Sequence, residues 1–332
     1  MKSYGGLFDE IVSVPNLERA ATAAAKGKRN SPEVARFLGQ ADEELPQLSA
    51  ELVTGEYTPR PYRQFRIRDP KPRTISCADF RDRVIHHAVC DVIGPLIERR
   101  FIYDSYACRT GKGAHRAAAR AQAMARRHCY FLKLDVAGFF DSVDHEILLA
   151  LLAHTFREKR LLVLMEVIIR SAPPGARAGK GLPIGNLTSQ WFANLYLDGL
   201  DHYVKEEMRM PGYIRYMDNM LVFGDSKAGL WRTHDAIRDN LDRHRALYLK
   251  KTATVLAPVT EGIPFLGLRI FPGRWRLQRQ RFLRTRRRMR GRERSFLAGE
   301  LAPEQLVLSA RAAQGILSWF GIKGVLPKGL EA

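Results

Sequence analysis

The chain has 332 residues, 45% of them hydrophobic and 27% charged, a balance typical of a globular protein that buries a core and divides into more than one subdomain. Because 54 lysines and arginines stand against 35 acidic residues, the formal net charge is +19, which favours a polyanionic partner, most often nucleic acid. No stretch resembles a membrane span or a signal peptide, so we expect a cytoplasmic protein with no membrane partner.

The first 60 residues are predicted to form a helical lead-in. Leu45, Leu48 and Leu52 recur at helical spacing, and Thr54–Pro59 ends that helix. The chain contains no internal repeat and no long low-complexity segment.

The next segment is predicted to be a β-hairpin. Aromatic or aliphatic residues alternate with polar ones over 62–68, and 73–76 returns as the partner strand after a proline-containing turn. The hairpin is rich in Arg and Lys, which fits either a solvated edge or a lid whose cations bind a triphosphate. A helix is predicted to follow over 80–100.

Two stretches end in carboxylates. Tyr130–Asp135 has the pattern of a short strand, followed by an apolar helix with Asp141 or Ser142 as its N-cap. Tyr213–Gly224 has the pattern of a hairpin with Asp218 at its tip. Taken alone, this tip fits an ordinary turn. If the two strands lie side by side, their aspartates can hold two Mg²⁺ ions roughly 3.5–4 Å apart for in-line attack on a phosphoryl group.

A glycine-containing turn opens a helix at Thr188 or Ser189, with Trp191 and Phe192 on its apolar face. Such a turn can present backbone N–H groups to an anion, and a well-capped core helix explains the pattern equally well. Short strands are predicted at 247–251 and 263–270.

The C-terminal part is strongly basic. Eleven arginines lie between Arg274 and Arg294, with Glu293 as the only acid among them. Aromatic and aliphatic residues are threaded through these arginines, which indicates a folded basic surface and not a disordered tail. Such a surface should bind phosphates, with an affinity that weakens steeply as salt increases. A last helix is predicted through Leu306, Ala310 and Ala313.

Taken in order, these motifs resemble those of a reverse transcriptase over roughly residues 50–320. The run Lys133–His145 is similar to the family's first catalytic strand, Tyr216–Asn219 to its Tyr-x-Asp-Asp hairpin, and Phe265–Gly267 to its primer-grip turn. Most reverse transcriptases carry Gln-Gly-x-x-x-Ser-Pro where this chain has Ile184–Gln190. The form Ile-Gly-x-x-x-Ser-Gln resembles the reverse transcriptases of diversity-generating retroelements, and Tyr106–His115 is also similar to that group.

The resemblance implies an α+β right-hand polymerase of fingers, palm and thumb, with an antiparallel palm sheet and a helical thumb. The expected divisions are a helical N-terminal lead-in at 1–60, fingers at 61–130, a palm at 131–272 with a fingers/palm excursion around 150–190, and a basic helical thumb at 273–332.

The activity implied by the resemblance is that of an error-prone RNA-directed DNA polymerase, a nucleotidyltransferase with a two-metal mechanism. It would copy a template-repeat RNA into cDNA, misincorporating opposite adenines, for mutagenic retrohoming and hypervariation. The expected cofactor is Mg²⁺, with Mn²⁺ as the alternative ion. The expected partners are template RNA, cDNA, dNTPs and a small basic accessory variability protein.

The resemblance also assigns residues to roles. The expected catalytic residues are Asp135, Asp218, Asn219 and Lys250. The expected metal ligands are Asp135, the Val136 carbonyl and Asp218. The expected dNTP-binding residues are Lys71, Arg73, Phe140, Ile184, Gly185 and Gln190. The basic segment is expected to bind nucleic acid through Arg274, Arg276, Arg279, Arg281, Arg284, Arg286, Arg287 and Arg288.

Three of these roles have a specific chemical reason. Phe140 would block a ribose 2′-OH and so select dNTPs. Lys250 would protonate the departing pyrophosphate. Ile184 replaces an amide near the incoming nucleotide with an apolar side chain, and we hypothesise that this lowers fidelity.

One position departs from the family pattern. Asn219 stands where the family's hairpin has a second aspartate, and an amide oxygen is a weaker ligand for a hard cation than a carboxylate. Two alternatives therefore stay open beside the retroelement enzyme. The chain could be another bacterial reverse transcriptase, of the retron or antiphage-defence type, or a catalytically impaired RNA-binding form.

Overall fold

The computed structural model describes residues 4–67 and 73–318. The predicted α+β class, with antiparallel sheets, is confirmed. The helices are α1 (Phe8–Val12), α2 (Val14–Ala25), α3 (Pro32–Gly39), α4 (Ala41–Thr54), α5 (Phe80–Glu98), α6 (Ala114–Ala125), α7 (Phe139–Ser142), α8 (His145–Thr155), α9 (Lys159–Arg170), α10 (Leu187–His202), α11 (Lys227–Arg245), α12 (Arg279–Leu297) and α13 (Pro303–Ser318). The strands are β1 (Arg63–Ile67), β2 (Arg73–Cys77), β3 (Tyr130–Asp135), β4 (Tyr213–Tyr216), β5 (Asn219–Gly224), β6 (Val255–Pro258), β7 (Ile263–Phe265), β8 (Leu268–Ile270) and β9 (Trp275–Leu277).

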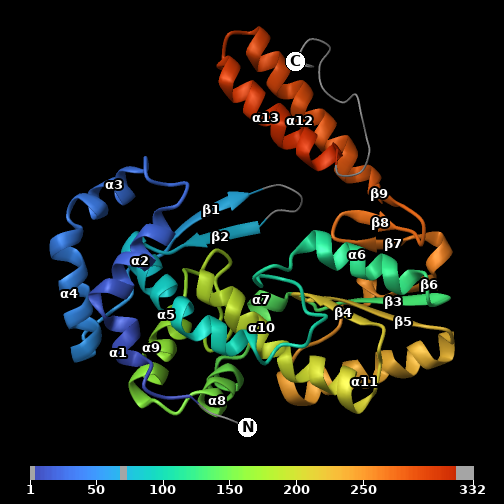
Figure 1. Cartoon of the computed structure of the whole chain (residues 1–332), viewed down its shortest axis with the longest axis horizontal. Helices are drawn as coiled ribbons and strands as arrows, with labels where there is room; N and C mark the ends of the chain where they lie inside the picture. Colours follow the sequence, from blue (N-terminus) through green and yellow to red (C-terminus); the bar gives the residue numbers. More distant parts are fainter. Residues whose placement is uncertain (1–3, 68–72, 319–332) are drawn as a thin grey trace.

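The N-terminal helices form one side of the molecule (Figure 1). Leu45, Leu48 and Leu52 are buried as the helical spacing predicts, and α4 ends at Gly55 in the left-handed conformation that a helix C-terminus favours. Helices α1, α2 and α3 pack against α5, which is buried along most of its length. The β1–β2 hairpin projects from this side, beginning a few residues after α4.

The central sheet has the strand order β4-β5-β3-β6, and every neighbouring pair is antiparallel. Successive residues of β3 point to opposite faces, so Leu132 and Leu134 pack on one side and Phe131 on the other. The first face is covered by α10 and α11, and the second by α6 and the small β7-β8-β9 sheet. Burial on both faces explains why β3 and β5 have few polar residues.

Two local predictions were wrong. The segment 247–251 makes an isolated bridge between Leu249 and Val136, and the pairing strand is β6 instead. The chain turns through a short 3-10 helix at Lys251–Ala253 before it can pair further with β3. The helix α8 is capped by Asp144, which accepts hydrogen bonds from two backbone N–H groups, because the residues expected to cap it belong to α7.

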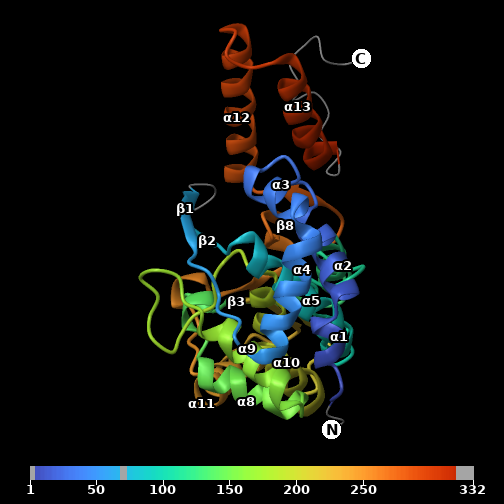
Figure 2. The ribbon, with the colours of Figure 1, turned by 90° about the vertical axis from the view of Figure 1, so that its left-hand side faces the viewer.

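The basic segment forms the long helix α12, which pairs with α13 away from the rest of the molecule (Figures 1 and 2). Met289 on α12 packs against Ala310 and Ala313 on α13, so the pair has a small core of its own. The β7-β8-β9 sheet leads directly into α12. Among the residues described, no helix is long and apolar enough to cross a membrane.

Candidate active site

The tip of the β4–β5 hairpin is a two-residue turn made of Met217 and Asp218. Tyr216 and Asn219 are paired across it, and Met217 has a φ of 56°, which is uncommon for a residue with a side chain. In the neighbouring pair of strands, Asp135 is opposite Asn219. Opposed Cα atoms of antiparallel strands are about 4.5–5.5 Å apart. The two predicted carboxylates therefore lie at one end of the sheet, and both are half-buried.

Asn219 is in contact with the aspartate beside it. Its Nδ2 atom donates a hydrogen bond to Oδ1 of Asp218 over 3.3 Å. The amide thus orients the Asp218 carboxylate without adding a negative charge. An aspartate at this position would place a further carboxylate beside Asp135 and Asp218.

Val136 and Lys250 join the site through their backbone. Val136 forms a bridge with Leu249, and the Lys250 N–H donates to the Asp135 carbonyl over 2.8 Å. The Lys250 side chain is exposed. The structure therefore brings Asp135, Asp218, Asn219, Val136 and Lys250 together at one sheet end.

The donor set suits a hard divalent cation. Within residues 4–67 and 73–318, no group of three or more His, Cys, Asp or Glu side chains gathers as a metal site. Asp135 and Asp218 supply carboxylate oxygens, and Val136 supplies a backbone carbonyl at the same strand end. Mg²⁺ needs few protein ligands because water and substrate phosphates complete its shell. Two carboxylates with a carbonyl therefore fit Mg²⁺ better than a metal that requires a closed protein cage.

Some of the predicted nucleotide-binding residues are joined to α7 and to the β1–β2 hairpin by backbone hydrogen bonds. Phe140 on α7 packs edge-on against Phe139, and its carbonyl accepts a hydrogen bond from the Leu182 N–H over 2.7 Å. The Ile184 carbonyl accepts from the Ser76 N–H on β2 over 3.1 Å. The segment that holds Ile184 is therefore tied both to α7 and to the β1–β2 hairpin.

Gly185 is required by this close approach. It has a φ of 131°, and a Cβ atom there would lie 2.8 Å from the Ser76 carbonyl oxygen. Gln190 is half-buried on α10, and Arg73 is the first residue of β2. Lys71 lies outside the described residues, so the structure does not place it.

A cavity of about 570 Å³ lies between the β1–β2 hairpin and the loop of residues 171–184. Its lining includes the cations Arg66, Arg177 and Lys180 and the carboxylate of Asp141. Ile184 belongs to its wall, so this polar hollow adjoins the predicted nucleotide residues.

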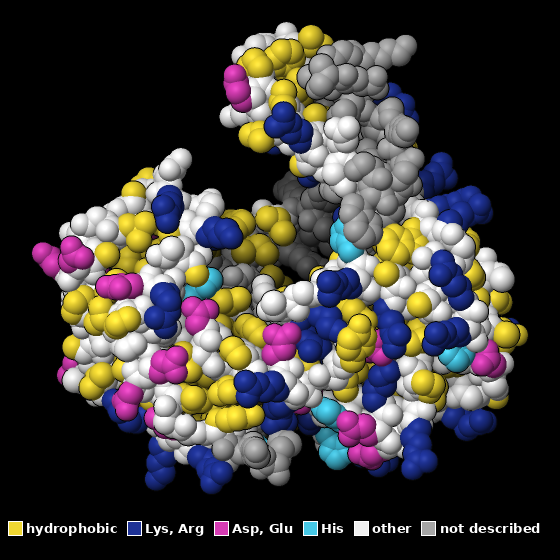
Figure 3. Space-filling view, viewed as in Figure 1, with side chains coloured by type: hydrophobic (Ala, Val, Ile, Leu, Met, Phe, Trp, Pro, Cys, Tyr) yellow, Lys and Arg dark blue, Asp and Glu magenta, His cyan; other side chains and the backbone are white. Residues whose placement is uncertain are grey.

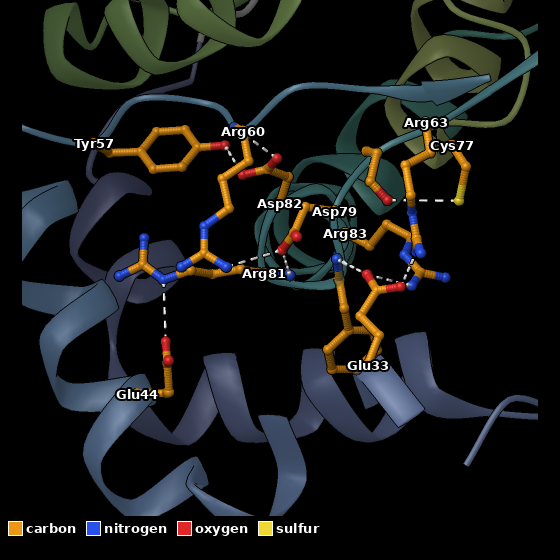
Figure 4. A network of polar contacts seen from close by, with 12 residues as sticks. Glu33, Glu44, Tyr57, Arg60, Arg63, Cys77, Asp79, Arg81, Asp82 and Arg83 are labelled. Carbon is orange, nitrogen blue, oxygen red and sulfur yellow. Dashed lines mark hydrogen bonds and ion pairs between the residues drawn. The ribbon is translucent and has the colours of Figure 1, made fainter. Parts of the chain in front are cut away.

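Carboxylates fix the base of the β1–β2 hairpin onto the N-terminal helices (Figure 4). Glu33 on α3 pairs with Arg63 at the start of β1. Asp82 on α5 accepts hydrogen bonds from the Tyr57 hydroxyl and from the Arg60 N–H, both over 2.9 Å. Burial raises the pKa of Asp82 to about 6, although both hydrogen bonds oppose that rise. The hairpin is thus held at its root by side chains outside its own strands.

The predicted basic surface contains two kinds of arginine. Seven of the eight predicted residues are exposed. Arg281 is half-buried and donates to the Leu266 carbonyl over 3.1 Å, so it holds the β7–β8 turn. That turn has positive φ at both Leu266 and Gly267. Lys and Arg side chains also gather over α6 and beside β9 (Figure 3).

The sequence analysis did not identify the buried polar residues that contact the β4–β5 hairpin. Arg215 on β4 is fully buried, pairs with Asp201 on α10 and contacts the carbonyl of Met217 in the turn. A usable signal was present, because Asn194, Asp198 and Asp201 recur at helical spacing between the apolar residues of α10. Such polar residues, if buried, need a charged or hydrogen-bonding partner.

Comparison with known proteins fits this geometry. Protein YkfC of Escherichia coli (strain K12) is 24% identical over 286 residues, which are 73% of this chain and 75% of YkfC. The group II intron-encoded protein LtrA of Lactococcus lactis subsp. cremoris is 25% identical over 173 residues, which are 50% of this chain and 29% of LtrA. The chain thus spans less than a third of the length of LtrA.

Two solved telomerase structures share the fold. The telomerase of Candida albicans, in complex with a fragment of telomeric RNA, has a TM-score of 0.51 at 10% identity, over 68% of this chain and 48% of that one. The telomerase of Candida tropicalis has a TM-score of 0.51 at 12% identity, over 70% of this chain and 59% of that one. At these identities the likeness concerns the fold alone.

The family described as reverse transcriptase (RNA-dependent DNA polymerase) matches residues 67–270. The match covers more than half of the chain and includes β3, which ends at Asp135, and the β4–β5 hairpin, whose turn holds Asp218. The chain therefore belongs to the reverse transcriptase family.

Proposed function

We propose that this chain is an RNA-directed DNA polymerase that extends a primer at a two-metal site held by Asp135 and Asp218. The observation that carries the proposal is the register of β3 against β5, which sets Asp135 opposite Asn219 and next to the turn that holds Asp218. When bound, Mg²⁺ would neutralise charge on the reacting phosphates. The two carboxylates would orient the 3′-hydroxyl and the triphosphate at the end of the sheet.

The surrounding residues would select and position the nucleotide. Phe140 would stand against the sugar and exclude a 2′-OH, and the cations Lys71 and Arg73 would bind the triphosphate. Lys250, whose backbone is bonded to Asp135, would donate the proton that the pyrophosphate takes up. Ile184, Gly185 and Gln190 would line the nascent base pair.

The same proposal assigns the parts of the molecule. The helical lead-in would end at residue 60 and the fingers would comprise 61–130. The palm would comprise 131–272, with the excursion around 150–190, and the thumb would comprise 273–332. The exposed arginines of the thumb would bind the template–cDNA duplex through its phosphates.

Primer extension on an RNA template with Mg²⁺ and dNTPs tests the two-metal site. We expect cDNA from the unaltered chain, and no product from Asp135→Ala or Asp218→Ala. RNA binding should persist in both variants, because neither residue belongs to the basic surface. Undiminished extension by either variant would refute the assignment of the metal site.

We further propose that the polymerase is error-prone at template adenines, as in a diversity-generating retroelement. This rests on Ile184–Gln190, in which Ile184 replaces an amide at the nascent base pair. An apolar side chain there cannot hydrogen-bond to the base or minor groove and so discriminates less between pairs. A small basic accessory variability protein would then act with the chain on the template-repeat RNA. Sequencing of the cDNA would show errors concentrated at template adenines, reduced by Ile184→Gln.

A second candidate is an enzyme of the group II intron type. The specific observation in its favour is the similarity to LtrA, an intron-encoded protein. This candidate predicts accurate cDNA, with errors spread evenly over the four template bases. The same sequencing experiment therefore separates it from the retroelement enzyme. RNA binding without any primer extension would instead indicate the catalytically impaired RNA-binding form, the alternative suggested by Asn219.

A further inference from the structure

Arg215 occupies an unusual place for a charged residue. It is fully buried on β4, on the sheet face that packs against α10. Its guanidinium pairs with Asp201, with Nε and Nη2 within 2.6–2.9 Å of the carboxylate oxygens. Asp201 is also fully buried and accepts a further hydrogen bond from the Tyr213 hydroxyl over 2.8 Å. Such a buried pair is costly to form unless every donor is satisfied.

The remaining donor of Arg215 points at the catalytic turn. Its Nη1 atom donates to the Met217 carbonyl over 3.2 Å and to Oδ1 of Asn194 over 3.0 Å. Met217 is the residue immediately before Asp218 and carries the positive φ of the turn. The guanidinium therefore links the interior of α10 to the backbone that aims the Asp218 carboxylate.

The contacts of Arg215 with Asp201 and Asn194 anchor β4 to α10, whereas its bond to the Met217 carbonyl reaches the turn itself. The additional bond to Met217 requires the planar fork of a guanidinium, because a single ammonium cannot reach Asp201 and the turn together. Groups behind a metal ligand that fix its orientation commonly control metal affinity as strongly as the ligand itself.

We propose that Arg215 is a positioning residue that, held by Asp201 and Asn194, fixes the Met217–Asp218 turn so that the Asp218 carboxylate faces Asp135. This inference rests on the proposed metal-binding role of Asp135 and Asp218. The orientation of the turn is fixed before metal or nucleotide binds, because the hydrogen bonds of Arg215 are all made within the chain itself.

The test measures Mn²⁺ binding to the full chain by electron paramagnetic resonance, which needs no catalytic turnover. Arg215→Lys keeps the charge and the contact with Asp201 but loses the bond to the turn. Asn194→Ala removes the side-chain acceptor that orients Nη1, together with the bond from Asn194 Nδ2 to the Ala107 carbonyl, and keeps the backbone acceptor for Nη2 of Arg215. Tyr213→Phe is the matched control, because it weakens the same buried network without touching the turn. Thermal unfolding of each variant reports the loss of stability separately.

We expect Arg215→Lys and Asn194→Ala to weaken Mn²⁺ binding by about tenfold or more. Tyr213→Phe should lower stability and change Mn²⁺ affinity by no more than about twofold. The Tyr213 hydroxyl does not reach the turn, and only groups that contact the turn should affect how Asp218 binds the metal. If Arg215→Lys does not fold, the comparison of Mn²⁺ affinity between Asn194→Ala and Tyr213→Phe is sufficient to test the inference.

Mn²⁺ affinity unchanged in both turn variants would overturn the inference and leave Arg215 with a structural role only. Asp218→Ala distinguishes this from failure of the underlying site. If Mn²⁺ binding does not depend on Asp218, the proposed metal site is itself wrong, and the positioning role falls with it.

Discussion

Phe140 is the residue that we propose excludes a ribose 2′-OH from this site. It stands on α7, five positions after Asp135, and its backbone is bonded to the segment that leads to Ile184. Phe140→Ala should therefore open space beside the sugar and raise incorporation of ribonucleotides by about tenfold or more relative to dNTPs. Single-nucleotide extension with each rNTP and dNTP measures this ratio. Phe140→Tyr keeps the bulk and should preserve the exclusion of rNTPs; an unchanged ratio in Phe140→Ala would remove Phe140 from this role.

Which site residues could be predicted from sequence depended on how local their pattern was. Asp135 and Asp218 end short apolar runs, so neighbouring residues alone identify them as strand-end carboxylates. Arg215 could not be predicted in the same way, because its role depends on which face of β4 packs against α10. Arg215 and Asp201 are 14 positions apart and lie on different elements, so no local pattern reveals that they meet.

The root of the β1–β2 hairpin carries a pH-dependent element. The pKa of Asp82 is raised to about 6 by burial, against an ordinary value of 3.8, so the folded chain binds this proton more tightly than the unfolded chain. The contribution of Asp82 to the free energy of unfolding must therefore decrease as pH rises from about 4 through about 6. Above that pH the contribution stays small.

Chemical unfolding at pH 5 and pH 7 tests this effect. Between these values the unaltered chain should lose about 1 kcal/mol of stability through Asp82. Asp82→Asn should lack that part of the pH dependence, whereas Tyr57→Phe keeps the carboxyl and should retain it. An Asp82→Asn chain with the same difference between pH 5 and pH 7 as the unaltered chain would show that another group is responsible.

The arginines of helix α12 are expected to have two different roles: some bind nucleic acid, and one holds the β7–β8 turn. Arg279, Arg286 and Arg287 are exposed and lie along one stripe of the helix, whereas Arg281 bonds to the Leu266 carbonyl. Replacing the three exposed arginines by Gln should lower the salt slope of RNA–DNA duplex binding by about 2 to 3. Binding constants measured over a series of salt concentrations give this slope. Arg281→Gln, the matched control, should leave it unchanged; an equal loss from Arg281→Gln would contradict the distinction.

Elements with strong periodicity were predicted well and edge elements poorly. The helices at 41–54 and 80–98 carry clear apolar patterns, whereas a helical form of the basic segment was expected only from the family resemblance. The strand predicted at 247–251 was wrong because the chain there makes a single bridge beside Asp135, and β6 takes the edge position. Hydropathy alone does not reveal which of two apolar segments pairs with β3 at the edge of the sheet.

At the scale of the whole molecule, α+β class and an antiparallel sheet with Asp135 and Asp218 at one end could be predicted from motif order. The tie between the Ile184 segment and β2, made by the Ser76 N–H, could not, because it joins residues more than 100 positions apart. This hydrogen bond connects the β1–β2 hairpin to the segment that we propose lines the nascent base pair.

Polymerase activity is tested by primer extension on an RNA template with Mg²⁺, comparing the unaltered chain with Asn219→Asp. Asn219 contributes an amide that bonds to Asp218, and a carboxylate there would add a stronger ligand for a hard cation. We expect Mg²⁺-dependent cDNA that increases with Asn219→Asp and disappears when Asp135→Ala is added. No cDNA from either chain, with RNA still bound, would contradict the polymerase assignment.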